Sequence, residues 1–154
     1  MSTYSLQVQW KRREQVFLDQ QYSRKHIWRF DGGITLQASS SPHVVPLPLS
    51  DVSAVDPEEA FVASVSSCHM LWFLSISARQ GYLIDSYKDD PVGTMKKNRD
   101  GKMAMTKIEL RPSIDFSGGH LPDDKKIGEI HVEAHDNCFI ANSIKSKVRV
   151  AGFI

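Results

Sequence analysis

Hydrophobic and polar residues alternate along the first third of the chain. Between residues 5 and 12, Leu6, Val8 and Trp10 occupy every second position. This is the period of a β-strand with one buried face. We therefore expect the chain to begin with a strand in which these three side chains share a face.

Two further strands are predicted around a glycine-rich turn. Residues 27–30 and 34–38 are mostly apolar or β-branched, and Asp31-Gly32-Gly33 separates them. A short glycine-containing segment between two such runs is typical of a hairpin. The next stretch, residues 39–56, contains three prolines and is predicted to connect to the following element without forming a helix.

A long helix is predicted to begin after Asp56. The Asp56 side chain can cap it, Pro57 suits the first helical position, and Glu58 favours the positive end of the helix dipole. Gly81 is a natural stop. Residues 65–76 are apolar on nearly every side of this helix. One sheet of so small a chain cannot cover all of them, so we expect a second subunit to cover the rest.

The second half of the chain is predicted to form strands at 83–97 and 102–116, joined at the Asp100-Gly101 step. A helix is predicted from Pro122 to 135, and residues 148–153 are predicted to form the last strand. This order of elements predicts a single α+β domain, residues 1–154, in which a mainly antiparallel sheet packs on the long helix.

Composition narrows the function classes. The chain has 154 residues and a net charge of +1, which gives no general attraction to nucleic acid or to an anionic membrane. The basic cluster near Lys11 to Arg13 is expected to be a solvated strand edge. The apolar run 70–74 is too short to span a bilayer, and no signal peptide is apparent, so we expect a cytoplasmic protein without nucleic-acid or membrane partners.

The two cysteines, Cys68 and Cys138, are the candidates for chemistry. Cys68 lies in the middle of the long helix, and each cysteine has polar neighbours in the sequence. Asp136-Asn137 can cap a short helix that starts at Cys138, where the helix dipole favours a thiolate and a lowered pKa. For either cysteine alone, simple packing in the core is the alternative.

Two segments resemble the OsmC/Ohr family, the osmotically inducible and organic hydroperoxide resistance proteins. Pro57-Glu58-Glu59-Ala60-Phe61, followed by Cys68, resembles the first cysteine helix of that family, and residues 134–142 resemble its second cysteine segment. The Phe30 to Gly33 turn and the element order agree. Residues 28–42 and 67–70 look most like a less characterised branch of the family. Phe139 departs from the pattern, since the family usually has proline after the second cysteine.

The resemblance implies a fold, a reaction and a set of roles. It implies an intertwined homodimer that acts as a thiol peroxidase on organic hydroperoxides, with a small dithiol or a protein thiol as reductant and no cofactor or metal. It implies that Cys68 attacks the peroxide and that Cys138 resolves the resulting sulfenic acid as a disulfide. It also implies an arginine beside Cys68, held by Glu58; Arg24 is the first choice and Arg29 the second.

Helix geometry constrains this set of residues. Ten residues of straight helix separate Glu58 from Cys68 by about 15 Å, which side chains do not bridge. Either the helix breaks near Phe61, or the arginine and glutamate approach Cys68 from elsewhere, for example from a partner subunit. An apolar pocket near Trp72, Phe73 and Phe139 would suit a bulky hydroperoxide, although a core role is open for each of these aromatic residues.

Two other functions remain open. His131, His135 and Cys138 have a metal-ligand spacing that Cys68 and His69 can complete as a zinc site. Alternatively, the chain is a non-enzymatic dimer of the same fold that binds a ligand or senses redox state.

Overall fold

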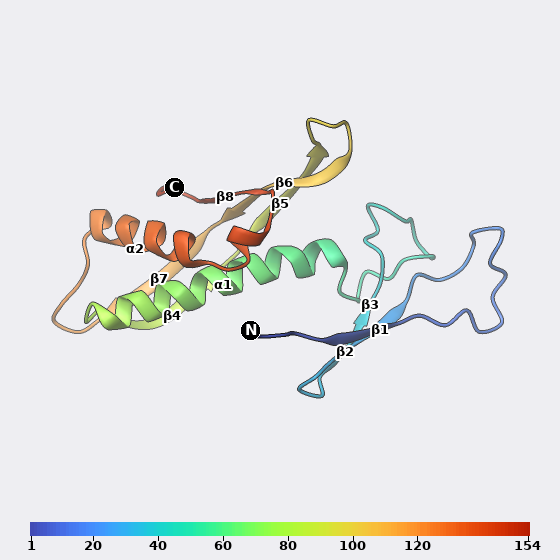
Figure 1. Ribbon diagram of the computed structural model, residues 1–154, viewed down its shortest axis with the longest axis horizontal. Coiled ribbons are helices and arrows are strands. Elements are labelled where there is room, and N and C mark those ends of the chain that lie inside the picture. Colours follow the sequence, from blue (N-terminus) through green and yellow to red (C-terminus); the bar gives the residue numbers. More distant parts are fainter. The chain divides into compact units, whose positions relative to one another are not determined.

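The computed structural model describes residues 1–154 and confirms the α+β class (Figure 1). It divides into two units, Met1–Ala60 and Phe61–Ile154. The elements are β1 (Leu6–Gln9), β2 (His26–Phe30), β3 (Thr35–Ala38), α1 (Pro57–Arg79), β4 (Leu83–Asp89), β5 (Val92–Lys97), β6 (Met103–Leu110), β7 (Pro112–Ser117), α2 (Asp124–Asn137), a short 3-10 helix (Ala141–Ser143) and β8 (Lys147–Val150).

The first unit is built on an antiparallel sheet in the order β1-β2-β3. Its register aligns Val8, Trp28 and Leu36 across the three strands and, one position further, Gln9 with Ile27 and Gln37. Because successive side chains point to opposite faces, the sheet has one mainly apolar and one mainly polar face. The predicted hairpin between β2 and β3 is confirmed.

The predicted start of α1 is confirmed by its hydrogen bonds. The Asp56 carboxylate accepts the backbone N–H of Glu59 at 2.7 Å, and the Glu59 carboxylate accepts the backbone N–H of Asp56 at 3.4 Å. This reciprocal pair satisfies two N–H groups that the first helical turn leaves free. The helix then runs for 23 residues without a break. The alternative that the helix breaks near Phe61 is therefore wrong.

One face of α1 is buried in the second unit. Val65, Phe73 and Ile76 are almost completely buried, whereas Leu71 is 60% exposed. By length and composition alone, α1 is long and apolar enough to cross a membrane, although its longest unbroken apolar run is short. Its buried face packs in the core of the unit, so α1 is a core helix and not a membrane span.

The strands of the second unit form two small sheets, β4-β7 and β5-β6-β8. The strand predicted at 83–97 is broken at residues 90–91, and the one predicted at 102–116 is broken at Arg111. Pro91 has no N–H to offer a sheet partner. The Asp89 carboxylate accepts the backbone N–H of Arg111 at 2.6 Å. At this break between the strands, a side chain therefore accepts the N–H that a neighbouring strand's carbonyl would accept in a continuous sheet.

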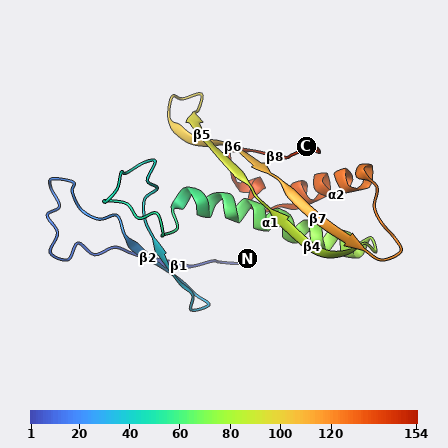
Figure 2. The same ribbon diagram turned by 180° about the vertical axis from the view of Figure 1, so that it is seen from behind.

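Two hydrophobic clusters form the core of this unit. Figures 1 and 2 both show α1 and α2 side by side, next to β4 and β7. Where these elements meet, the buried residues are Phe73, Ile76, Ile130 and Ala134. The second cluster joins the early part of α1 to β6 and β8, and its buried residues are Val62, Val65, Ile108, Leu110, Val148 and Val150.

Candidate functional site

Cys68 lies on α1 at the edge of the buried face. Val65 and His69, on either side of it in the sequence, are buried, while the Cys68 side chain is partly exposed. Residues three and four apart on a helix share a face, which explains why 65 and 69 point inward together. Cys68 is adjacent to that face and remains within reach of solvent.

Cys138 follows the last residue of α2 and is completely buried. Its backbone N–H donates to the carbonyl of His135 at 3.2 Å, and the N–H of Ala141 donates to its sulfur at 3.4 Å. The prediction that Cys138 starts a helix is wrong, because it caps the C-terminal end of α2. The predicted fall in pKa is wrong as well: burial, with a smaller effect from the Cys68 thiol, raises the pKa of Cys138 to about 11.

The two thiols are neighbours. The Cys68 thiol is near enough to Cys138 to contribute to its raised pKa, and both cysteines are in the free thiol form. In the sequence they are 70 positions apart. The packing of α1 against α2 brings together two residues that the sequence could pair only by resemblance.

A pair of buried histidines joins the two helices, with His69 on α1 next to Cys68 in the sequence and His131 on α2. His69 and His131 share a hydrogen bond of 3.0 Å between Nε2 and Nδ1, and their rings stack 5.3 Å apart. Burial lowers the pKa of His69 to about 4 and that of His131 to about 3. Both imidazoles are therefore neutral at pH 7. In the sequence, the only feature that connected His69 with His131 was the possible zinc-ligand pattern that contains both residues.

The zinc alternative finds no support in this arrangement. The Nδ1 atom of His131 is engaged with His69, and no three His, Cys, Asp or Glu side chains are grouped so that they could hold a metal ion. A structural zinc site takes four such ligands in a tetrahedron. Of the three aromatic residues predicted to line an apolar pocket, Trp72 and Phe139 meet edge to face at 5.6 Å, whereas Phe73 is completely buried in the core.

Arg24 and Glu58 line one pocket within the first unit. This pocket has a volume of about 620 Å³, and aromatic side chains form part of its wall. Arg24 lies 3.8 Å above the ring of Tyr22, and its Nη1 donates to the carbonyls of Gln20, at 3.0 Å, and Tyr22. The guanidinium is in no ion pair, so its charge is not neutralised by a carboxylate.

Arg29 has different surroundings. Its Nη1 donates to the side-chain oxygens of Gln7 at 2.8 Å and Gln9 at 3.2 Å, on the polar face of the β1-β2-β3 sheet. Of the two candidate arginines, Arg24 is the one that shares a pocket with Glu58.

The aromatic wall of this pocket was not predicted. Trp10, Phe17 and Tyr22 pack together with ring centroids 4.7 to 5.7 Å apart. Trp10 follows the last residue of β1, and the alternation of Leu6, Val8 and Trp10 was the only sequence signal for it. Phe17 and Tyr22 belong to an irregular loop, in which no periodicity indicates where a side chain points.

Comparisons with known proteins give a consistent result. The chain is 54% identical to an OsmC-like protein of unknown function from Vibrio cholerae, over 97% of this chain and 98% of that one, with a TM-score of 0.96. No curated protein matches the chain.

More distant structures share the fold. An organic hydroperoxide resistance protein from Elizabethkingia anophelis is 12% identical, with 97% and 93% of the two chains covered and a TM-score of 0.71. The organic hydroperoxide resistance protein OhrB of Bacillus subtilis is 16% identical, with 97% of this chain and 95% of that chain covered and a TM-score of 0.63. The family model for OsmC-like proteins matches residues 50–151, which include both cysteines. The chain belongs to the OsmC-like protein family.

Proposed function

We propose that this protein is a thiol peroxidase that reduces organic hydroperoxides, with Cys68 as the attacking residue and Cys138 as the resolving residue. The observation that carries the proposal is that the two cysteines of the chain, distant in sequence, are neighbours as free thiols. Family membership supports a role in peroxide resistance or redox chemistry, since organic hydroperoxide resistance proteins share the fold.

The different environments of the two cysteines suit different roles. Cys138 is fully buried and its pKa is raised to about 11, so it is almost entirely a thiol at pH 7. Cys68 is partly exposed and therefore accessible to a peroxide. The attacking cysteine must be accessible to the substrate and must react as a thiolate. The resolving cysteine needs only to contact the sulfenic acid that forms on the attacking one.

The reaction balances with these two residues and a reductant. The Cys68 thiol first loses its proton, and the thiolate attacks the distal oxygen of the hydroperoxide. The S–O bond of a sulfenic acid forms as the O–O bond breaks, and the leaving alkoxide takes up the proton that the thiol released and departs as the alcohol. The Cys138 thiol displaces the hydroxyl of that sulfenic acid, which gives a disulfide and water. A small dithiol or a protein thiol then reduces the disulfide by exchange.

Arg24 and Glu58 are proposed to complete the site. An arginine keeps its charge and offers a planar set of donors, which suits a thiolate and a developing oxyanion. Because α1 is unbroken, Glu58 is about ten residues of helix away from Cys68. We propose that Arg24 and Glu58, which line one pocket without forming an ion pair, serve the thiols of the other subunit in an intertwined homodimer whose subunits are single domains of residues 1–154. The cytoplasm is the proposed compartment, since its reducing conditions keep the thiols free.

Turnover with two oxidants tests the function. The reduced protein, supplied with a dithiol, is expected to consume cumene hydroperoxide faster than hydrogen peroxide, because apolar and aromatic side chains line the Arg24 pocket. Peroxide loss is measured at equal concentrations of the two oxidants. Equal rates would refute the preference, and no consumption of either would favour a non-enzymatic binding or sensing module.

Replacing Arg24 by alanine is expected to slow cumene hydroperoxide reduction by tenfold or more, roughly the effect of removing one charge that stabilises a thiolate. It should also move the pH–rate profile toward higher pH. Arg24→Lys, which keeps the charge, should recover part of the rate. Arg29→Ala is the matched control and should stay near wild type; the opposite pattern would move the role to Arg29.

The exposed side of α1 gives a test of the dimer. Leu71 is an apolar residue in the middle of α1 that is 60% exposed, so Leu71→Glu is expected to convert a dimer into a species of 17.4 kDa in analytical ultracentrifugation. Val132→Glu, on α2 at a residue that is 45% exposed, is the control and should leave the dimer intact. A wild-type protein that sediments as a single chain would contradict the dimer.

A further inference from the structure

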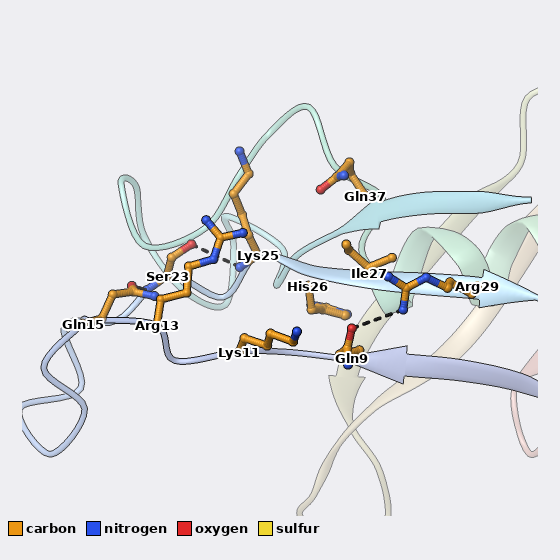
Figure 3. Close-up of a pocket in the computed structure, with 10 residues that line it drawn as sticks. All are labelled: Gln9, Lys11, Arg13, Gln15, Ser23, Lys25, His26, Ile27, Arg29 and Gln37. Carbon is orange, nitrogen blue, oxygen red and sulfur yellow. Dashed lines mark hydrogen bonds between the residues drawn. The ribbon is translucent and has the colours of Figure 1, made fainter.

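The polar face of the β1-β2-β3 sheet carries a pocket that the proposed reaction does not use. It has a volume of about 460 Å³, within the range of small-molecule sites. Figure 3 shows Gln9, Ile27, Arg29 and Gln37 on the strands or close to them, with Arg13 and Lys25 at the loop end. The pocket lies entirely within the first unit.

Positive charge is concentrated in this pocket. Lys11, Arg13, Lys25 and Arg29 line it, and no Asp or Glu does. Lys25 is paired with Asp51 at 2.5 Å, but the other three are in no ion pair. The chain as a whole has a net charge of only +1, so the cluster is a local excess. Three like charges around one cavity repel each other, and an anion between them offsets this repulsion by its attraction to all three.

The side chains indicate the kind of anion. Three uncompensated cations match a ligand with about three negative charges. Two of them, Arg13 and Arg29, are guanidinium groups, whose forked donors suit the oxygens of a phosphate. The side-chain oxygen of Gln9 already accepts from Arg29, which fixes that guanidinium at the wall and leaves the Gln9 amide N–H groups to donate.

We propose that this pocket binds a small molecule that carries a di- or triphosphate group. The anion is expected to lie between Arg29 on β2 and the Lys11–Arg13 segment after β1, and to receive further hydrogen bonds from the side-chain amides of Gln9 and Gln37. The proposal is independent of the peroxidase function, because it uses neither of the cysteines and neither Arg24 nor Glu58.

Calorimetric titration with sodium tripolyphosphate tests the site. The wild-type protein at low salt is expected to bind one equivalent per chain. The double variant Lys11→Gln/Arg13→Gln should bind at least tenfold more weakly. Both positions are exposed, and an unchanged melting temperature shows that the fold is retained. The matched control Lys96→Gln/Lys97→Gln removes two exposed, unpaired lysines of β5 and should stay within twofold of wild type.

Four results would overturn the proposal. The first is the absence of saturable binding, and the second is an equal loss in the pocket and control variants, which would mean that only net charge is sensed. The third is binding of citrate as tightly as tripolyphosphate, which would remove the preference for phosphate. The fourth is tighter binding of a 20-nucleotide DNA strand that depends on the same two residues, which would make the pocket part of a nucleic-acid surface.

Discussion

Replacing Cys68 by serine is expected to abolish reduction of cumene hydroperoxide. The loss should be at least about a thousandfold, the scale typical of removing an enzyme's nucleophile. The physical reason is that a serine hydroxyl stays protonated at neutral pH and does not attack the O–O bond, while Cys138 is fully buried with a raised pKa and cannot substitute for it. Peroxide consumption with a dithiol reductant is the measurement.

The variant Cys138→Ser is the matched control, because it removes the other sulfur and leaves the attacking one. We expect it to perform one rapid turnover and then to lose activity, with a mass gain of about 32 or 48 Da as the sulfenic acid of Cys68 takes up one or two more oxygens. An active Cys68→Ser variant, together with an inactive Cys138→Ser variant, would reverse the two roles. Full, lasting activity of Cys138→Ser would remove the resolving role.

Acid is expected to destabilise the folded protein strongly. An unfolded histidine takes up a proton below a pH of about 6.5. In the folded state, the pKa of His69 is about 4 and that of His131 about 3. Between these limits the unfolded chain binds more protons than the folded one, so the free energy of unfolding falls as the pH falls. For two such groups the loss between pH 7 and pH 5 is about 2 to 4 kcal/mol.

Urea unfolding at pH 7 and at pH 5 measures this loss. His131→Gln removes one of the two titrating groups and keeps a side chain able to bond His69, so it should reduce the loss by about half. His43→Gln, at an exposed position, should leave the loss unchanged. A free energy of unfolding that is equal at the two pH values, or a loss that His131→Gln does not reduce, would contradict burial of the pair as neutral imidazoles.

The sequence was most informative where structure depends on neighbouring residues. The start of α1 was predictable because Asp56 and Glu59 bond each other across a single turn. The end of α2 was misjudged for a related reason. Asp and Asn favour the start of a helix, but here the Asn137 side chain donates to the carbonyl of Glu133 and stays within α2. Cys138 consequently closes one helix and does not open another.

The sequence could not indicate contacts that depend on tertiary packing. His69 and His131 meet because two helices pack together, and no local pattern encodes that meeting. The same is true of the Arg24 pocket, where a loop arginine, aromatic residues and Glu58 share one cavity. For the cysteines, the family resemblance suggested the pairing. The burial of Cys138, which raises its pKa, depends on the packing of distant segments and has no local signal in the sequence.

The central claim is that peroxide oxidises Cys68 and that Cys138 then closes a disulfide with it. The most direct test is a single-turnover experiment in which fully reduced protein is mixed with one equivalent of cumene hydroperoxide, and both free thiols and intact mass are followed. We predict a rapid loss of two thiols per chain, a mass lower by about 2 Da, and a peptide map that links Cys68 to Cys138. A protein that keeps both thiols free, or that joins cysteines of different chains instead, would contradict the account.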